Sequence, residues 1–495
     1  MKLRASLLTG LLATATVAFG VPNLATVATP GTIDDFKIQQ GGVVDQTAIG
    51  TLLTGAELPA YEATDNIELI AELETGASSD IMFQRREGRQ MLDGVEIDAV
   101  KDYAFVGTVY ASDGFRVVDV TNPREPQLLA SVACGGFHND IVVWENYVVI
   151  GHDGGAKICD GQAALGVRPS GAGIWIFDVT DPAKPVLVKS VGKAGVAQQG
   201  SELTDATHNI SLNPEEGLVL FSTAGFHTAP KWGYFDLKGD ILANEPVELS
   251  MRDLTRDVTA AADGCHDQGL AFDVETATGD VRDFIFCAAI GTTIIWDITE
   301  DATNPVHVAT IANPSISIHH GARLAPDGRT LVLNDELAGA AAGSCSAGAP
   351  TGTLFAYDIS VPEAPVALGY GSAPDLPNAA VCTSHFYNFI APSEMDGGQQ
   401  LSVTGWYSGG AIIHDFSRAA GVGPIGVAPV YAQLTPEGVR SWTAYAYRGF
   451  IYSASYGGSN TGFFVAEMDG YDAEGAEPQP FDEGTSWSRW TQNEI

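Results

Sequence analysis

The sequence repeats one short motif, and this repeat restricts the possible folds more than any other feature. The motif is an apolar strand that ends in Asp, followed by an apolar residue and, in most copies, Ser or Thr. Its aspartates, Asp119, Asp178, Asp236, Asp297, Asp358 and Asp415, are separated by 59, 58, 61, 61 and 57 residues. A degenerate copy ends at Glu467, 52 residues after the last aspartate. Such a period indicates an array of similar structural units.

Each unit has the pattern of four short antiparallel strands. Two apolar strands come first, as at 140–144 and 147–151, then the strand that ends in Asp, and then a fourth strand such as 185–191. Four strands in about 40–60 residues are the repeating unit of a β-propeller, in which neighbouring sheets bury each other's faces. The repeated Asp is expected to be structural, because its carboxylate can cap the turn into the fourth strand.

The number of units suggests how the array closes. The seventh unit, at 440–468, lacks a fourth strand, and residues 66–74 before the first unit alternate as a fourth strand does. Adding this segment to the last unit would remove both exposed sheet edges. We therefore predict an all-β fold, a seven-bladed β-propeller closed by an N-terminal strand.

The beginning of the sequence has the features of an export signal. Lys2 and Arg4 precede an apolar stretch, and Ala18-Phe19-Gly20 offers small residues for cleavage. No apolar run in the remainder is long enough to span a bilayer. We expect a secreted or periplasmic protein without a membrane span. The predicted divisions are a signal peptide (1–20), an N-terminal extension (21–65), the propeller (66–468) and an acidic C-terminal tail (469–495).

The charge balance limits the partners. The chain has 25 basic and 61 acidic residues, a formal net charge of −36. Such a surface repels nucleic acid and anionic membranes, so both are excluded as partners. The charge either keeps the protein soluble or attracts cations and basic partners. We expect a monomer whose partner is an extracellular protein, a polymer or a small ligand.

Five histidines occupy the start of the first strand in successive units. They are His138, His208, His266, His320 and His385, and the first and seventh units have Gly94 and approximately Ser441 at that position. First strands line the axis of a propeller, so equivalent positions would surround one mouth of the channel. Five imidazoles there could hold a transition metal, most plausibly zinc or copper.

Two acidic residues could assist these histidines. Glu336, near the end of a second strand, would be a carboxylate ligand or a base on the same face, and Asp267 would orient an imidazole as a neighbour of the ligands. His319 could substitute for His320. The competing interpretation is structural: a histidine that bonds to the neighbouring blade would recur in a repeat protein whether or not anything binds.

The six cysteines fit three disulfides. The unit layout pairs Cys134 with Cys159, Cys265 with Cys287, and Cys345 with Cys382, all on the histidine face of an exported chain in which disulfides persist. The alternative is a thiolate metal ligand such as Cys265 beside His266. Two long connections, 152–172 and 338–351, are expected over the same face, where they would either form a binding site or be tolerated insertions.

These units resemble the LVIVD-repeat family of exported β-propeller proteins. The resemblance rests on the Asp–(Val/Ile/Phe)–(Thr/Ser) strands, Tyr103-Ala-Phe-Val-Gly107, Gly264-Cys-His-Asp267, Asn334-Asp-Glu336, Gly405-Trp-Tyr-Ser-Gly-Gly410 and Trp490-Thr-Gln-Asn-Glu-Ile495. It covers about residues 66–495 and implies the fold but no single reaction.

Two functions remain open at this point. The first is a binding or scaffold module that presents its loop-bearing, histidine-rich face to a partner. The second is a metal-dependent enzyme, a hydrolase or oxidoreductase, with its site at the channel mouth. A propeller fold hosts both kinds of function, so the site has to decide between them.

Overall fold

A computed structural model describes most of one compact unit, residues 31–495, and none of a second unit, residues 1–30. The described residues are 42–43, 50–92, 95–110, 113–152, 173–192, 207–214, 216–223, 232–237, 250–252, 265–336, 352–371, 381, 383–417 and 426–471. Nearly all of them lie in antiparallel strands and short connections. No helix within this part of the chain has the length and apolar character needed to cross a bilayer.

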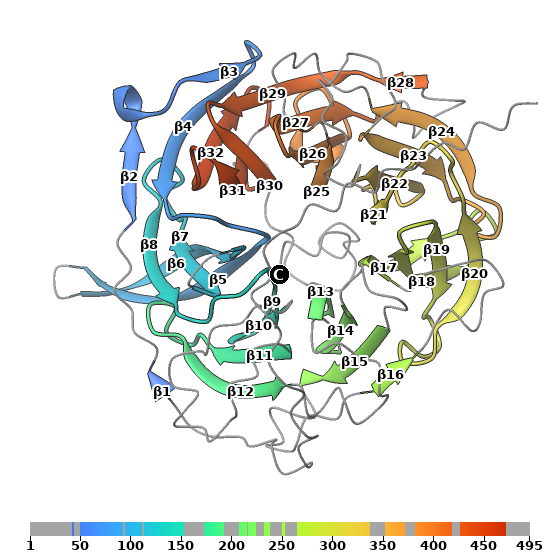
Figure 1. Cartoon of the computed structure of the whole chain (residues 1–495), viewed down its shortest axis with the longest axis horizontal. Helices are drawn as coiled ribbons and strands as arrows, with labels where there is room; N and C mark the ends of the chain where they lie inside the picture. The colour runs from blue at the N-terminus through green and yellow to red at the C-terminus, as the bar shows by residue number, and fades with distance from the viewer. Residues whose placement is uncertain are drawn as a thin grey trace, which may run out of the picture. The chain divides into compact units, whose positions relative to one another are not determined.

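Four consecutive strands form each of the first sheets, in chain order from the inside outwards (Figure 1). The first sheet contains β5 (Ile81–Leu92), β6 (Val95–Gly107), β7 (Phe115–Asp119) and β8 (Gln127–Val132). The second contains β9 (Asn139–Trp144), β10 (Tyr147–His152), β11 (Gly173–Asp178) and β12 (Val186–Gly192). The third contains β13 (Thr207–Asn213), β14 (Leu218–Thr223), β15 (Trp232–Asp236) and β16 (Ser250–Arg252).

The next two sheets repeat this order. One contains β17 (Asp267–Glu275), β18 (Val281–Ala288), β19 (Thr293–Asp297) and β20 (Val306–Ile311). The other contains β21 (His319–Leu324), β22 (Thr330–Asp335), β23 (Leu354–Asp358) and β24 (Val366–Gly371), with β28 (Gly426–Ala428) added in parallel to β24.

The last eight strands of the pattern belong to one larger sheet. One half contains β25 (Ser384–Ile390), β26 (Leu401–Trp406), β27 (Gly410–Asp415) and β29 (Val430–Pro436). The other contains β30 (Val439–Tyr447), β31 (Phe450–Gly458), β32 (Phe463–Met468) and β4 (Ile67–Glu74). A short parallel pairing of β25 with β30 joins the halves. The N-terminal β4 pairs antiparallel with β32, in a register that runs from Ile67 opposite Met468 to Leu73 opposite Phe463.

The segment predicted as an N-terminal extension also contributes strands. β2 (Thr51–Thr54) pairs with β4, and β3 (Tyr61–Ala63) pairs with β29. The two-residue β1 (Gly42–Val43) pairs with β12. Residues 51–63 therefore lie against the sheets that contain β4 and β29, a position that the sequence did not suggest.

The innermost strands contact one another in a closed sequence. β5 contacts β9, and the contacts continue through β13, β17, β21, β25 and β30 back to β5. Figure 1 shows the sheets arranged around a common centre, with these strands nearest to it. An all-β arrangement of four-stranded antiparallel sheets around an axis is a propeller fold.

Neighbouring sheets bury each other's faces, which explains why the strands read as continuous apolar runs. In β11, Ile174, Trp175, Ile176 and Phe177 are all buried. The ring of Phe177 lies 5.0 Å from that of Phe115 in β7, so the third strands of adjacent sheets pack directly. Strands covered on both faces lose the alternation typical of a half-exposed sheet.

The repeated aspartate has the structural role predicted for it. In five copies its carboxylate accepts a hydrogen bond from the backbone N–H two residues later, as from Thr121 to Asp119 (2.9 Å) and from Ser360 to Asp358 (2.8 Å). This Asx turn redirects the chain from the third strand toward the fourth. The prediction of a turn-capping carboxylate is confirmed.

Candidate functional site

The structure brings the five repeated histidines together. Each lies on, or directly before, an innermost strand: His138 before β9, His208 in β13, His266 before β17, His320 in β21 and His385 in β25. Successive ring centroids are 5.1, 4.3, 4.7 and 4.2 Å apart in that order. Trp442 of β30 completes the circle, 4.4 Å from His385 and 5.1 Å from His138. We call these six side chains the central ring.

Burial keeps the imidazoles in the form that binds metals. His138, His266 and His385 are each 1% exposed and His320 is 3% exposed. Burial, followed by the neighbouring imidazoles, lowers the pKa of His266 and His320 well below the usual value. Burial also lowers the pKa of His385 well below that value. Neutral imidazole is the metal ligand, so these histidines are available to an ion at neutral pH.

Some imidazole nitrogens of the central ring are not used in hydrogen bonds to the backbone. His385 Nδ1 lies 2.9 Å from the backbone oxygen of Trp442, so Nδ1 carries the donated proton and Nε2 has the free electron pair. The Nδ1 atom of His320 has no hydrogen-bond partner among the described residues. His208 Nε2 lies 3.2 Å from His266 Nε2, so one of the two nitrogens must donate or both must face a shared partner.

Glu336 joins the ring from the end of β22. Its Oε2 atom lies 3.7 Å from His320 Nε2, and its Oε1 accepts a hydrogen bond of 2.8 Å from the hydroxyl of Tyr407. Burial raises the pKa of Glu336 to about 7. One ligand atom each from His266, His320 and Glu336 lie within 4.8 Å of one another, the one such grouping of three among the described residues. Two imidazoles and a carboxylate at this spacing can converge on a single ion.

An aromatic wall beside the histidines was missed by the sequence analysis. The ring of Tyr407 lies 5.0 Å from His385 and 4.9 Å from Tyr456, and Tyr456 lies 5.0 Å from Trp442. The signal for Trp442 was present, because it is the neighbour of Ser441, the residue assigned to the equivalent position in the seventh unit. Trp442 takes the place of a histidine in the seventh unit, and a pattern based on histidine alone does not find it.

Buried charges occupy the same innermost strands. Asp140 of β9 accepts a hydrogen bond of 2.7 Å from the backbone N–H of Ile210, and Tyr445 donates to Asp80. Burial raises the pKa of both carboxyls, and for Asp80 the charge of Arg323 partly offsets the effect. The charge of Arg323 thus opposes the desolvation of the Asp80 carboxyl in this interior.

Asp267 belongs to this group of charges. Burial raises its pKa to about 7, and its Oδ1 accepts the backbone N–H of Gln268 at 2.6 Å. Arg323 and His208 are among its electrostatic neighbours. The role predicted for Asp267, that of orienting an imidazole, stays a prediction.

One positional expectation was wrong. β5 begins at Ile81, so the first strand of the first unit starts well before Gly94, which falls between β5 and β6 and outside the described residues. The expected position was displaced because the β5–β6 hairpin is longer than the first hairpin of the other sheets. The Nδ1 atom of His319 lies 2.8 Å from Thr293 Oγ1, and it is His320 that groups with His266 and Glu336, so the substitution of His319 for His320 stays a prediction. The long connections predicted at 152–172 and 338–351 fall almost entirely outside the described residues.

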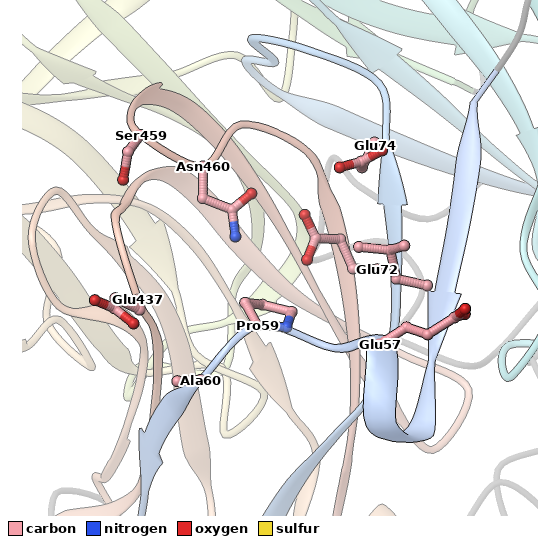
Figure 2. A pocket seen from close by; sticks show the side chains of 9 residues that line it. Glu57, Pro59, Ala60, Glu72, Glu74, Glu437, Ser459 and Asn460 are labelled. Carbon is pink, nitrogen blue, oxygen red and sulfur yellow. The ribbon is translucent and has the colours of Figure 1, made fainter.

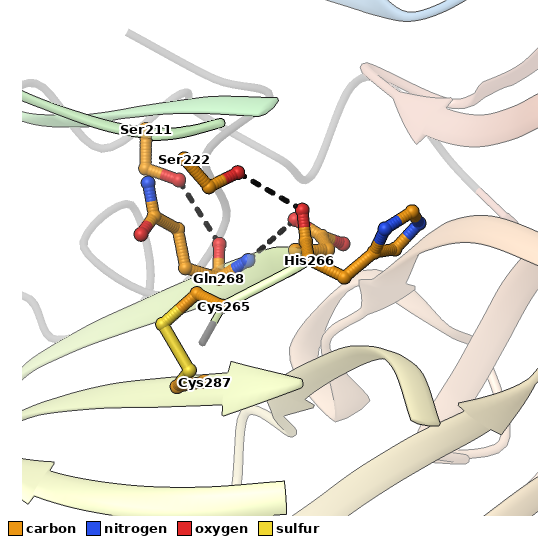
Figure 3. The surroundings of a disulfide bond; sticks show 7 residues. Ser211, Ser222, Cys265, His266, Gln268 and Cys287 are labelled. Atoms are coloured by element: carbon orange, nitrogen blue, oxygen red, sulfur yellow. Dashed lines mark hydrogen bonds between the residues drawn. A yellow bond between two sulfur atoms is a disulfide. The ribbon is translucent and has the colours of Figure 1, made fainter. Parts of the chain in front are cut away.

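The disulfide from Cys265 to Cys287 is present, as predicted (Figure 3). Cys265 is therefore not a thiolate ligand, and Figure 3 shows the His266 ring pointing away from the sulfur atoms. Hydroxyl donors on the preceding sheet fix this segment: Ser222 bonds the oxygen of His266 and Ser211 that of Gln268, both at 3.0 Å. Cys134 is also disulfide-bonded. Its predicted partner Cys159 lies outside the described residues, as do Cys345 and Cys382.

Comparison with known protein families agrees with the fold. A family model described as a beta propeller domain matches residues 99–251. The described strands have a β-propeller fold. No curated protein sequence matches this propeller.

Several solved structures are similar to this chain. The periplasmic gluconolactonase of Pseudomonas aeruginosa is 12% identical over 75% of this chain and 97% of that chain, with a TM-score of 0.46. A protein from Lactobacillus plantarum is 11% identical over 72% and 89%, with a TM-score of 0.45. A hypothetical selenium-binding protein from Sulfolobus tokodaii is 12% identical over 76% and 79%, with a TM-score of 0.39.

Proposed function

We propose that this propeller binds a divalent transition metal ion, zinc in preference to copper, through His266, His320 and Glu336. The observation that carries the proposal is the spacing of their ligand atoms, all within 4.8 Å of one another. Two histidines and a glutamate are a ligand set of catalytic zinc sites, in which a fourth position stays open for water or substrate. Low histidine pKa values support the proposal, since an ion would not compete with protons near neutral pH.

The chemistry that this ligand set supports is metal-assisted hydrolysis. A zinc ion with three protein ligands lowers the pKa of a bound water and polarises the bond under attack. Tyr407 would hold the second oxygen of Glu336 and so fix which oxygen faces the ion, through its 2.8 Å hydrogen bond. His208, whose Nε2 lies 3.2 Å from that of His266, is the remaining imidazole next to the ligand set.

A binding or scaffold module is the second candidate, and one observation favours it. Tyr110 and Phe137 are 53% and 42% exposed, and their rings form an edge-to-face pair with centroids 4.7 Å apart. Phe137 directly precedes His138, so the pair is close in the chain to the central ring. Exposed aromatic side chains are typical anchors for partners. Under this proposal the partner would be an extracellular protein, a polymer or a small ligand.

We further propose a monomeric ring of seven blades, closed where β4 completes the last blade. The pairing of β4 with β32 and the closed succession of innermost-strand contacts support it. The repeated Asx turns support the assignment of the blades to the LVIVD type. The disulfide supports export to a secreted or periplasmic location.

Zinc titration against a competing chelator tests the metal site. We expect one ion bound per chain, with affinity lowered at least about tenfold by His266→Ala, His320→Ala or Glu336→Gln, since each removes a ligand. His307→Ala is the control, because this histidine is exposed and lies on the outer strand β20. Equal affinity in all four variants would refute the site.

A further inference from the structure

A cavity lies between the N-terminal segment and the last blade, and none of the central-ring side chains lines it (Figure 2). Its volume is about 400 Å³. Its walls come from β2, the short turn η2 (Gly55–Glu57), β4, and two turns that flank β30 and β31. The acidic members of the lining are Glu57, Glu72, Glu74 and Glu437.

No cationic side chain among the described residues neutralises the four carboxylates. None of them has an ion-pair partner in the described part of the chain. Glu72 and Glu74 are two residues apart on one strand, so they project to the same side, and the charge of Glu74 helps to raise the pKa of Glu72 after burial. An uncompensated cluster of this kind attracts a cation.

Glu72 provides an independent sign of a ligand. Its side chain is only 1% exposed, yet it lines the cavity, and its Oε2 atom has no hydrogen-bond partner among the described residues. The other side of the carboxylate is adjacent to Asn460, which bonds it, and Figure 2 shows these two side chains turned toward each other. A buried carboxylate oxygen left without a donor is costly unless something supplies one.

The spacing of the carboxylates and the apolar residues in the wall favour an organic cation over a bare metal ion. Within the described residues, three ligand atoms come within 4.8 Å of one another only in the histidine site, so these glutamates are spread too widely to enclose a bare ion. Leu53, Pro59 and Ala60 add apolar surface to the wall. Separated carboxylates beside an apolar wall suit a ligand that carries ammonium groups on methylene chains, since the chain packs while the charged ends pair.

We propose that this cavity binds an alkylammonium ligand, with Glu72 as the buried acceptor and Glu437 as the acceptor on the opposite wall. The same chemistry is offered by a free polyamine and by a lysine side chain of a peptide. The site is separate from the histidine site and does not depend on a metal there.

Calorimetric titration of the intact protein tests this proposal, with spermidine and a blocked single-lysine peptide as probes. We expect saturable binding of one amine per chain, and competition between the two probes. Tighter spermidine binding would identify a polyamine as the ligand, and tighter peptide binding would identify a protein side chain. Glu72→Gln and Glu437→Gln should each lower the affinity at least about tenfold, because each removes one charge partner.

Glu68→Gln is the matched control, because Glu68 is an exposed carboxylate on the same strand β4 and does not line the cavity. Its affinity should stay within about twofold of the parent. An equal loss in Glu68→Gln and Glu72→Gln would show attraction by net charge alone and overturn the proposal. Absence of saturable amine binding at low ionic strength would overturn it as well. Calcium chloride that binds through Glu72 and excludes both amines would assign the cavity to a metal ion instead.

Discussion

The partly buried carboxyl group of Glu394 makes the stability of this protein depend on pH. Glu394, in the short turn η6 (Pro392–Glu394), accepts the backbone N–H of Ala391 through Oε2 at 2.9 Å. Burial raises its pKa to about 7. Between its ordinary value of 4.5 and about 7, the folded protein keeps a proton that the unfolded chain has lost. The contribution of Glu394 is therefore complete below pH 4.5 and is lost as the pH rises to about 7.

The substitution Glu394→Gln should remove this loss. The amide oxygen of the new side chain can still accept the Ala391 N–H, but the amide cannot ionise. The variant should therefore gain on the order of 2 kcal/mol relative to the parent as the pH rises from about 4.5 to about 7.5. Urea unfolding at several pH values, with a chelator present, measures the difference. Glu68→Gln, on an exposed position of β4, serves as the control. A difference between Glu394→Gln and parent that is constant over this pH range would contradict the assignment.

The sequence was sufficient to locate the residues whose role follows from the repeat. The Asx-turn aspartates and the five inward histidines occupy equivalent positions in successive units, so periodicity alone located them. Residues that occur once gave no such signal. Tyr407 packs against His385, Tyr456 packs against Tyr407, and the charge of Arg323 acts on His320, and only the folded arrangement shows these contacts.

At the scale of strands and sheets, the sequence showed which segments pair but not where added strands attach. The alternating segment 66–74 was recognised because it resembles the fourth strand of a unit. β2 and β3 were not recognised because they are short, outside the period, and paired at outer edges where few side-chain constraints apply. The acidic cavity depends on these two strands and η2, so it was beyond sequence analysis as well.

Deleting residues 66–74 should open the last blade. β4 supplies buried Leu69, Ala71 and Leu73 and the backbone partners of β32. Without it, β32 would become an exposed edge, so we expect aggregation or loss of cooperative unfolding. Light scattering and thermal melting measure both effects, and Glu68→Ala on the exposed side of β4 is the control. A deletion variant that stays monomeric and melts as the parent does would contradict closure by this strand.

At the scale of the whole molecule, the repeat places equivalent residues around one axis, and this brings the repeated histidines together. One histidine per blade is unremarkable in a single sheet. Around the centre, the same position gives five imidazoles whose neighbouring centroids are 4.2 to 5.1 Å apart. The fold thus brings the histidines together, while Glu336, contributed by one blade, lies close to His266 and His320 and would make the proposed site asymmetric.

A crystal structure of the native protein, with anomalous diffraction recorded on both sides of the zinc absorption edge, tests this account most directly. The account predicts one anomalous peak among the ring nitrogens of His266 and His320 and the carboxylate of Glu336, at about 2.0–2.2 Å from each ligand atom. No peak in protein purified without chelator and supplied with zinc, together with imidazoles bonded to the backbone of neighbouring blades, would contradict it.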